Sequence, residues 1–74
     1  MKVIIESTTK IIHFNGVPVR VWEGHTESGI KVNCFIARVA IDAKEPNVGE
    51  FEKELREQKP PSKEIEAFPL RVII

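Results

Sequence analysis

The stretch that decides the fold reads VPVRVWE at residues 17–23, GHTESG at 24–29 and IKVNCFIARVAI at 30–41. Two segments rich in β-branched residues flank a polar loop bounded by glycines, a pattern typical of a β-hairpin. If Glu23 faces Ile30 across this loop, apolar residues face each other along one side of the hairpin. The predicted pairs on this core side are Val21 with Val32, Val19 with Cys34 and Val17 with Ile36.

A second hairpin is predicted upstream at Asn15 and Gly16, because both residues accept the positive φ of a type I′ turn. The turn makes Phe14 the partner of Val17 and places both on the core side. The remaining predicted pairs are His13 with Pro18, Ile12 with Val19 and Ile11 with Arg20. The sequence therefore predicts an antiparallel meander of residues 10–14, 17–23 and 30–41, with the second strand in the centre.

Pro18 lies in this central strand although proline has no N–H group to give to a ladder. Its missing donor points toward the third strand, so we expect the second ladder to weaken near Phe35. The apolar alternation of the third strand changes at the same place, since Arg38 takes a core-side position. A β-bulge at residues 35–37 explains both observations.

A helix is predicted after the meander, where Asn47 followed by Glu50 resembles a capping pair. Val48, Phe51 and Leu55 form one apolar stripe at helical spacing, so we expect the helix to lie on the sheet. Two prolines at residues 60 and 61 end the helix. Its acidic face is interpreted as solvated surface, with a protein-binding or nucleic-acid-mimicking surface as the alternative.

Three more segments complete the predicted fold. Residues 2–5 are predicted as a short strand before a polar break at residues 7–9, and Ser62 is predicted to cap one more turn, with Ile65 and Phe68 inward. Residues 70–74, LRVII, are predicted as a strand that joins the sheet. The chain is thus interpreted as one α+β domain over residues 1–74. It comprises a three-stranded antiparallel β-meander packed against one amphipathic helix, with a C-terminal strand and a short N-terminal strand added to the sheet.

Composition narrows the classes of function. Net charge is zero over 74 residues, and it divides into five Lys/Arg against three Asp/Glu in residues 1–41 and six against eight in residues 42–74. This split is too mild for the basic stripe of a duplex-binding protein. The apolar run at residues 3–5 is too short for a signal peptide or a membrane span, so we expect neither. The single cysteine, Cys34, is interpreted as buried packing. We therefore expect a cytoplasmic protein.

Chemistry-bearing residues are few and scattered. His13, His25 and Cys34 have no metal-ligand spacing, so we expect no metal site and no cofactor. The loop at residues 23–29 is interpreted as solvated, with Glu23, His25 and Glu27 as a candidate interaction loop. No arrangement of residues indicates catalysis, and we expect a non-enzymatic protein.

The outward side of the predicted meander is more apolar than a solvated sheet face should be. One interpretation is that the C-terminal segment covers it as a second small core. Another is an interface with a protein or a second copy. A third is base stacking of single-stranded nucleic acid on Trp22 and Phe35, beside Arg20 and Lys31. This candidate interaction face comprises Ile11, His13, Pro18, Arg20, Trp22, Lys31, Asn33 and Phe35.

The favoured hypothesis from the sequence is a small intracellular accessory protein that acts as a non-catalytic protein–protein interaction module. Its partner is another protein or a second copy of the chain, with no membrane contact. The alternative hypothesis is a single-stranded nucleic-acid-binding module that uses the Arg20/Trp22/Lys31/Phe35 face.

Overall fold

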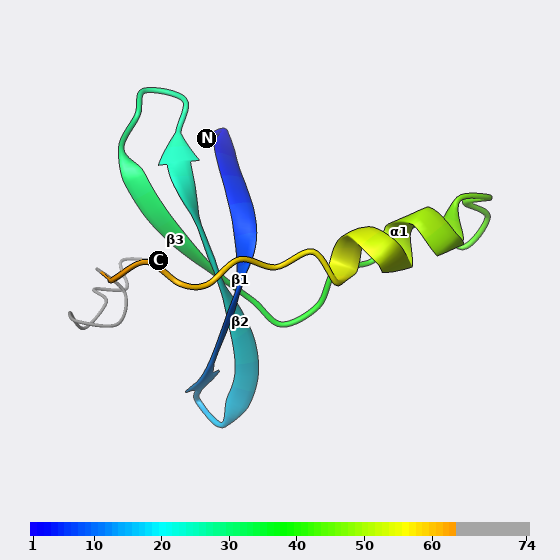
Figure 1. Cartoon of the computed structure of the whole chain (residues 1–74), viewed down its shortest axis with the longest axis horizontal. Helices are drawn as coiled ribbons and strands as arrows, with labels where there is room; N and C mark the ends of the chain where they lie inside the picture. The colour runs from blue at the N-terminus through cyan, green and yellow to red at the C-terminus, as the bar shows by residue number, and fades with distance from the viewer. Residues whose placement is uncertain (64–74) are drawn as a thin grey trace.

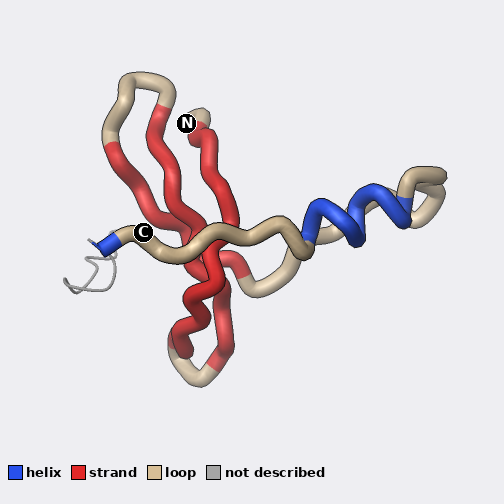
Figure 2. Tube along the Cα trace, in the orientation of Figure 1, coloured by secondary structure: helices blue, strands red, loops and turns tan. Residues whose placement is uncertain are grey.

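The computed structural model describes residues 1–63 of the chain. This part forms, in order, β1 (Val3–Phe14), β2 (Val17–Thr26), β3 (Lys31–Ile36) and α1 (Val48–Leu55). The strands make one antiparallel sheet with β2 in the centre (Figure 1 and Figure 2). The α+β class and the central position of the second strand are thus confirmed. The strand predicted at residues 70–74 and the inward positions of Ile65 and Phe68 lie outside the described residues.

The first hairpin has the predicted register, with Phe14 opposite Val17 and Ile11 opposite Arg20. Asn15 and Gly16 have φ values of 50° and 79°, as a type I′ turn requires. The short strand predicted at residues 2–5 is the first half of β1, where residues 3–7 pair with residues 26–22 of β2. The polar break predicted at residues 7–9 is an irregularity inside this long strand.

The second hairpin has a different register from the predicted one. Val21 lies opposite Phe35 and Trp22 lies opposite Cys34, whereas the predicted partner of Val21 was Val32. This shift of three residues is odd, so every side chain of β3 changes face relative to β2. The cause is the length of β2, which pairs with the N-terminal half of β1 as far as Thr26.

The turn between β2 and β3 is consequently shorter and later than the predicted loop at residues 24–29. Gly29, at a φ of 91°, donates its N–H to the Thr26 carbonyl at 3.0 Å. The N–H of Thr26 donates to the Ile30 carbonyl at 2.9 Å. Gly24 lies inside β2, opposite Ile5 and Val32.

Alternation along β2 defines two faces of the sheet. The Val21 face carries Val17, Val19, Val21 and Glu23, whereas the Trp22 face carries Pro18, Arg20, Trp22 and Gly24. Among the described residues, the buried apolar side chains are Val19 and Val21, both on the Val21 face. Cys34 and Val32, predicted to share their core, lie on the Trp22 face.

β3 ends at Ile36, opposite Arg20, so the strand predicted to reach residue 41 is shorter and the bulge predicted at residues 35–37 is wrong. The two-residue turn makes Phe14 and Val17 a hydrogen-bonded pair, so the backbone groups of Pro18 point toward β3. Continuing the register would bring Arg38 opposite Pro18, where a donor is missing. The chain leaves the sheet before that position.

A β-bulge interrupts β1 where residues 8–10 stand against the single residue Val21 of β2. Thr8 is fully buried there, and its Oγ1 donates a hydrogen bond of 2.6 Å to the Val21 carbonyl. The same oxygen accepts the N–H of Lys10 at 3.2 Å. The Arg20 guanidinium donates to the Thr8 carbonyl at 2.8 Å. Side chains thus replace the ladder bonds that the bulge removes.

Residues 57–62, the crossing segment, run from the end of α1 back to the bulge. Lys59 forms a parallel bridge with Thr8. The N–H of Thr9 donates to the Lys59 carbonyl at 3.0 Å, and the N–H of Lys59 donates to the Ser7 carbonyl at 3.1 Å. The open side of β1 is therefore paired at this one place.

Beyond the bridge, the crossing segment passes over the Val21 face, in front of the sheet in Figure 1. The N–H of Ser62 donates to Glu23 Oε1 at 2.9 Å, and Lys59 Nζ lies 4.0 Å from the same oxygen. Glu23 belongs to the Val21 face by alternation, and Val21 beside it is fully buried. The crossing segment thus occupies the face on which the helix was predicted to pack.

α1 projects away from the sheet (Figure 1), and none of its residues is buried. The predicted packing of its stripe on the meander is thus absent from residues 1–63, since the crossing segment takes that place. The predicted capping pair is also absent, because the Asn47 side chain makes no cap hydrogen bond. Instead the N–H and Nδ2 of Asn47 donate to Glu45 Oε1, at 3.1 and 3.0 Å.

Substitution of Gly24 tests the close approach of β1 to β2. An added Cβ would overlap the Ile4 carbonyl oxygen and lie 2.7 Å from Ile5 Cα. Gly24→Ala should therefore cost about 1–3 kcal/mol of unfolding free energy, through forced backbone shifts. Gly49→Ala is the control, since nothing lies within 4 Å of its Cβ and alanine is favoured there by about 1 kcal/mol. Urea titrations in which Gly24→Ala matched wild type would contradict the close approach.

Substitution of Thr8 tests the bulge. Thr8→Val keeps the shape but removes the hydrogen bonds of Oγ1 with the Val21 carbonyl and the Lys10 N–H. Loss of the buried bond to Val21 should cost about 1–3 kcal/mol. Thr8→Ser keeps the hydroxyl and should lose only about 1 kcal/mol for the methyl group. Because a core of this size supplies roughly 3–5 kcal/mol, chemical denaturation should show Thr8→Val close to unfolding. Equal midpoints for the two variants would show that the hydroxyl contributes nothing.

Candidate functional site

The predicted interaction face is divided between the two faces of the sheet. The Trp22 face carries Arg20 and Trp22, with Ile11 opposite Arg20 and His13 opposite Pro18. The remaining predicted residues follow the shifted register of β3 onto the Val21 face. They are Lys31 opposite His25, Asn33 opposite Glu23 and Phe35 opposite Val21.

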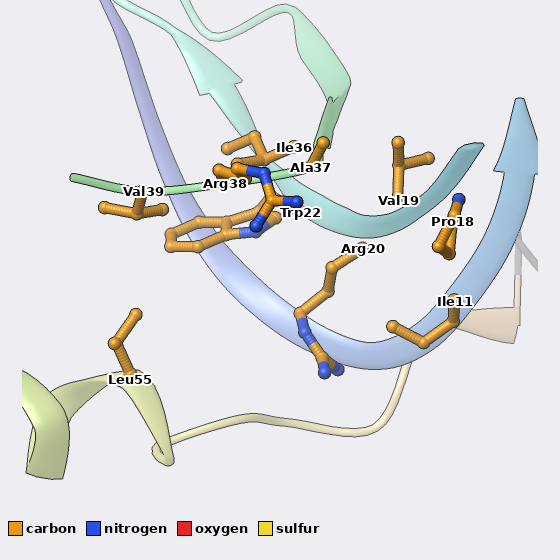
Figure 3. A pocket seen from close by; sticks show the side chains of 10 residues that line it. All are labelled: Ile11, Pro18, Val19, Arg20, Trp22, Ile36, Ala37, Arg38, Val39 and Leu55. Atoms are coloured by element: carbon orange, nitrogen blue, oxygen red, sulfur yellow. The ribbon is translucent and has the colours of Figure 1, made fainter.

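The Trp22 face bears a groove of about 200 Å³, shown in Figure 3. Its floor is the sheet, one side is the chain that leaves β3, and the end of α1 contributes Leu55, which points toward the Trp22 indole. The groove is mostly apolar, with two arginines. Its lining residues are Ile11, Pro18, Val19, Arg20, Trp22, Ile36, Ala37, Arg38, Val39 and Leu55.

Local sequence explains why the groove forms at this position. Pro18 stops the β2–β3 ladder, so residues 37–39 turn away from the sheet and become a wall instead of continuing the strand. Prediction from the sequence missed Val19, Ile36, Ala37, Arg38, Val39 and Leu55 as members of the site. The proline was the available signal, since it marks where the third strand must leave.

The two arginines of the groove differ in their surroundings. Arg20 is partly buried, and its hydrogen bond to the Thr8 carbonyl fixes the guanidinium near the bulge. Arg38 is exposed on the chain segment after β3. The groove therefore offers apolar floor and walls with positive charge on two sides, a composition suited to an apolar ligand that carries carboxylates.

The predicted interaction loop is not a cluster. Glu23 lies on the Val21 face, where it accepts a hydrogen bond from the N–H of Ser62 and forms an ion pair with Lys59. His25 is an exposed strand residue whose Nδ1 lies 2.9 Å from the Thr26 carbonyl oxygen. Glu27 lies in the turn, and its N–H donates to the Lys2 carbonyl at 3.2 Å. Glu23 thus has a structural partner within the chain.

Within residues 1–63, no three His, Cys, Asp or Glu side chains lie close enough together to hold a metal ion. Cys34 is half-buried opposite Trp22, on the face opposite its predicted core position. No helix in this part of the chain has the length and apolar character needed to cross a membrane.

Comparison of the chain with protein families, curated proteins and solved structures found no significant match.

The placement of Phe35 on the Val21 face can be tested by its partner. Its ring stacks on Phe14 at a centroid distance of 6.1 Å and an interplanar angle of 17°. Such pairs contribute about 0.5–1.5 kcal/mol beyond their buried area. A double-mutant cycle of Phe14→Ala and Phe35→Ala should therefore show a coupling energy of this size in thermal or urea unfolding. Additive effects would place the two rings apart, as the predicted register does.

Proposed function

We propose that this chain is a non-catalytic protein-binding module, an accessory protein of the cytoplasm, and that its partner docks in the groove on the Trp22 face. The observation that carries this proposal is the groove itself, which is lined by Trp22 together with apolar side chains and two arginines. Tryptophan and arginine dominate the binding energy of protein interfaces. Among the described residues, the crossing segment covers the other face of the sheet and not the Trp22 side.

The chemistry of the groove favours one kind of partner segment. A floor and walls built from Ile11, Ile36 and Val39 match the apolar side of an amphipathic helix. Arg20 and Arg38 favour carboxylates beside that apolar side. The partner is therefore an amphipathic helix with acidic residues flanking its apolar stripe.

Single-stranded nucleic acid is the alternative ligand. Trp22 could stack on a base while Arg20 and Arg38 contact phosphates. The nucleic-acid surface predicted from the sequence also includes Lys31 and Phe35, and these two residues lie on the opposite face of the sheet. A strand of nucleic acid bound along the Trp22 face would lose half of that set, so protein binding is favoured.

Trp22→Ala tests the proposal. The indole is only partly buried on a face without a described core, so the variant should keep a circular dichroism melting temperature close to that of wild type. Its partner binding should fall by at least about 30-fold, as truncation of a hot-spot residue costs about 2 kcal/mol or more. Binding is measured against the proteins that wild type captures from a lysate of its native host, and against labelled oligonucleotides.

The control is Ile30→Ala, which removes an exposed apolar side chain (65% exposed) from the β2–β3 turn, away from the groove. This variant should retain every captured protein. Unfolding of Trp22→Ala would assign the indole to a stabilising core. If folded Trp22→Ala captured the same proteins as wild type, the groove would not be the protein-binding site. If the variant lost only oligonucleotide binding, the nucleic-acid alternative would be favoured.

A further inference from the structure

The apolar stripe of α1 is largely uncovered by the described residues, and only Leu55 of the stripe lines the groove of its own chain. Val48 and Leu55 are 43% and 40% exposed, and no residue of the helix is buried. The helix stands out from the sheet with its N-terminal end farthest away (Figure 1). Burial of such a stripe is what normally stabilises a short helix, because eight residues are marginal in isolation. The helix therefore requires a surface that the described part of its own chain does not provide.

Charges border this stripe in a defined way. At about 100° per residue, Glu52 and Glu54 fall on either side of the stripe, while Lys53 falls on the opposite face. Three glutamates against one lysine give α1 a net charge of −2. The helix is thus apolar along its centre and acidic along both borders.

These features are complementary to the groove. The groove is apolar along its floor and carries Arg20 and Arg38, so a helix of this kind would bring carboxylates near both guanidinium groups. The chain's own α1 contributes only Leu55 to the groove. An eight-residue helix is about 12 Å long, and this one leads away from the groove, so Val48 at its far end does not reach the groove of its own chain.

We propose that the partner of the groove is a second copy of this chain, and that two copies exchange their helices, α1 of each lying in the groove of the other. The inference rests on the proposed protein-binding function of the groove. Two-fold symmetry makes the same contact twice, which is the commonest arrangement of soluble oligomers. The opposite net charges of residues 1–41 and 42–74 agree with this reciprocal contact.

A charge exchange between copies tests the proposal with the full chain. One variant, Arg38→Glu, places a negative charge in the groove and leaves the helix unchanged. The other, Glu52→Lys with Glu54→Lys, makes the helix borders positive and leaves the groove unchanged. In sedimentation velocity, wild type should show a mass twice that of one chain, which is 8.4 kDa. Each variant alone should dimerise at least about tenfold more weakly, because like charges then face each other twice.

Mixing the two variants should restore a heterodimer, because each of its two contacts again joins opposite charges. Detection uses one variant with a fluorescent N-terminal label, and circular dichroism verifies that both variants are folded. Trp22, the single tryptophan, provides a second measurement on the unmodified protein. Dilution of wild type through the dimer dissociation range should shift its emission to the red as the groove becomes hydrated.

Three results would overturn the exchange. They are a wild type that stays monomeric at every concentration, a dimer insensitive to all three charge reversals, and a mixture that forms no heterodimer. A monomeric wild type whose capture of a host protein still depends on Trp22 would overturn only the second-copy assignment and leave the groove as a protein-binding site. If neither dimerisation nor capture of a host protein depended on Trp22, both the second-copy assignment and the protein-binding function of the groove would be wrong.

Discussion

One hydrogen bond, from the buried hydroxyl of Thr8 to the carbonyl of Val21, holds the structure together where its strands stop matching. Three residues of β1 face one residue of β2 at this place, so an ordinary ladder would leave backbone groups in the interior without partners. The hydroxyl of Thr8 supplies the donor that the Val21 carbonyl would otherwise lack. The other edge of β1 forms the bridge to Lys59 at the same residue. The path of the crossing segment, and hence the choice of covered face, follows from that bulge.

The division into a covered and an open face separates stability from binding. Polar bonds to Glu23 hold the crossing segment over the Val21 face, where the buried valines lie. The Trp22 face receives no such cover from the described residues and instead has a wall, because the chain turns away after Ile36. Arg20 links the two functions, since its side chain lines the groove while its guanidinium satisfies the carbonyl of Thr8. The groove therefore depends on the bulge for the position of one of its two cations.

The residues of the turn made the register of the first hairpin predictable, whereas no turn residue fixed the register of the second. Asn15 and Gly16 permit one turn type, and that turn fixes the register directly. In β3, apolar Val32, Cys34 and Ile36 alternate with Lys31, Asn33 and Phe35, so the hydrophobic pattern favours the predicted register and selects the wrong face. The deciding interactions are the pairing of residues 3–7 with the end of β2 and the close approach at Gly24, both of long range. Of the eight residues proposed for the interaction face, Ile11, Pro18, Arg20 and Trp22 line the groove, while its wall of residues 36–39 and Leu55 depends on where β3 ends.

The early end of β3 leaves part of the β2 edge exposed to strands of other molecules. Beyond Ile36, the β1–β2 ribbon continues to its turn without a neighbour on the β2 side among residues 1–63. An uncovered strand edge is a template on which other chains can add, and such addition leads to fibrils. Pro18 lies on that edge with its nitrogen directed outward, and it denies an incoming strand one of the donors it needs. The residue that shapes the groove thereby also protects the ribbon from aggregation.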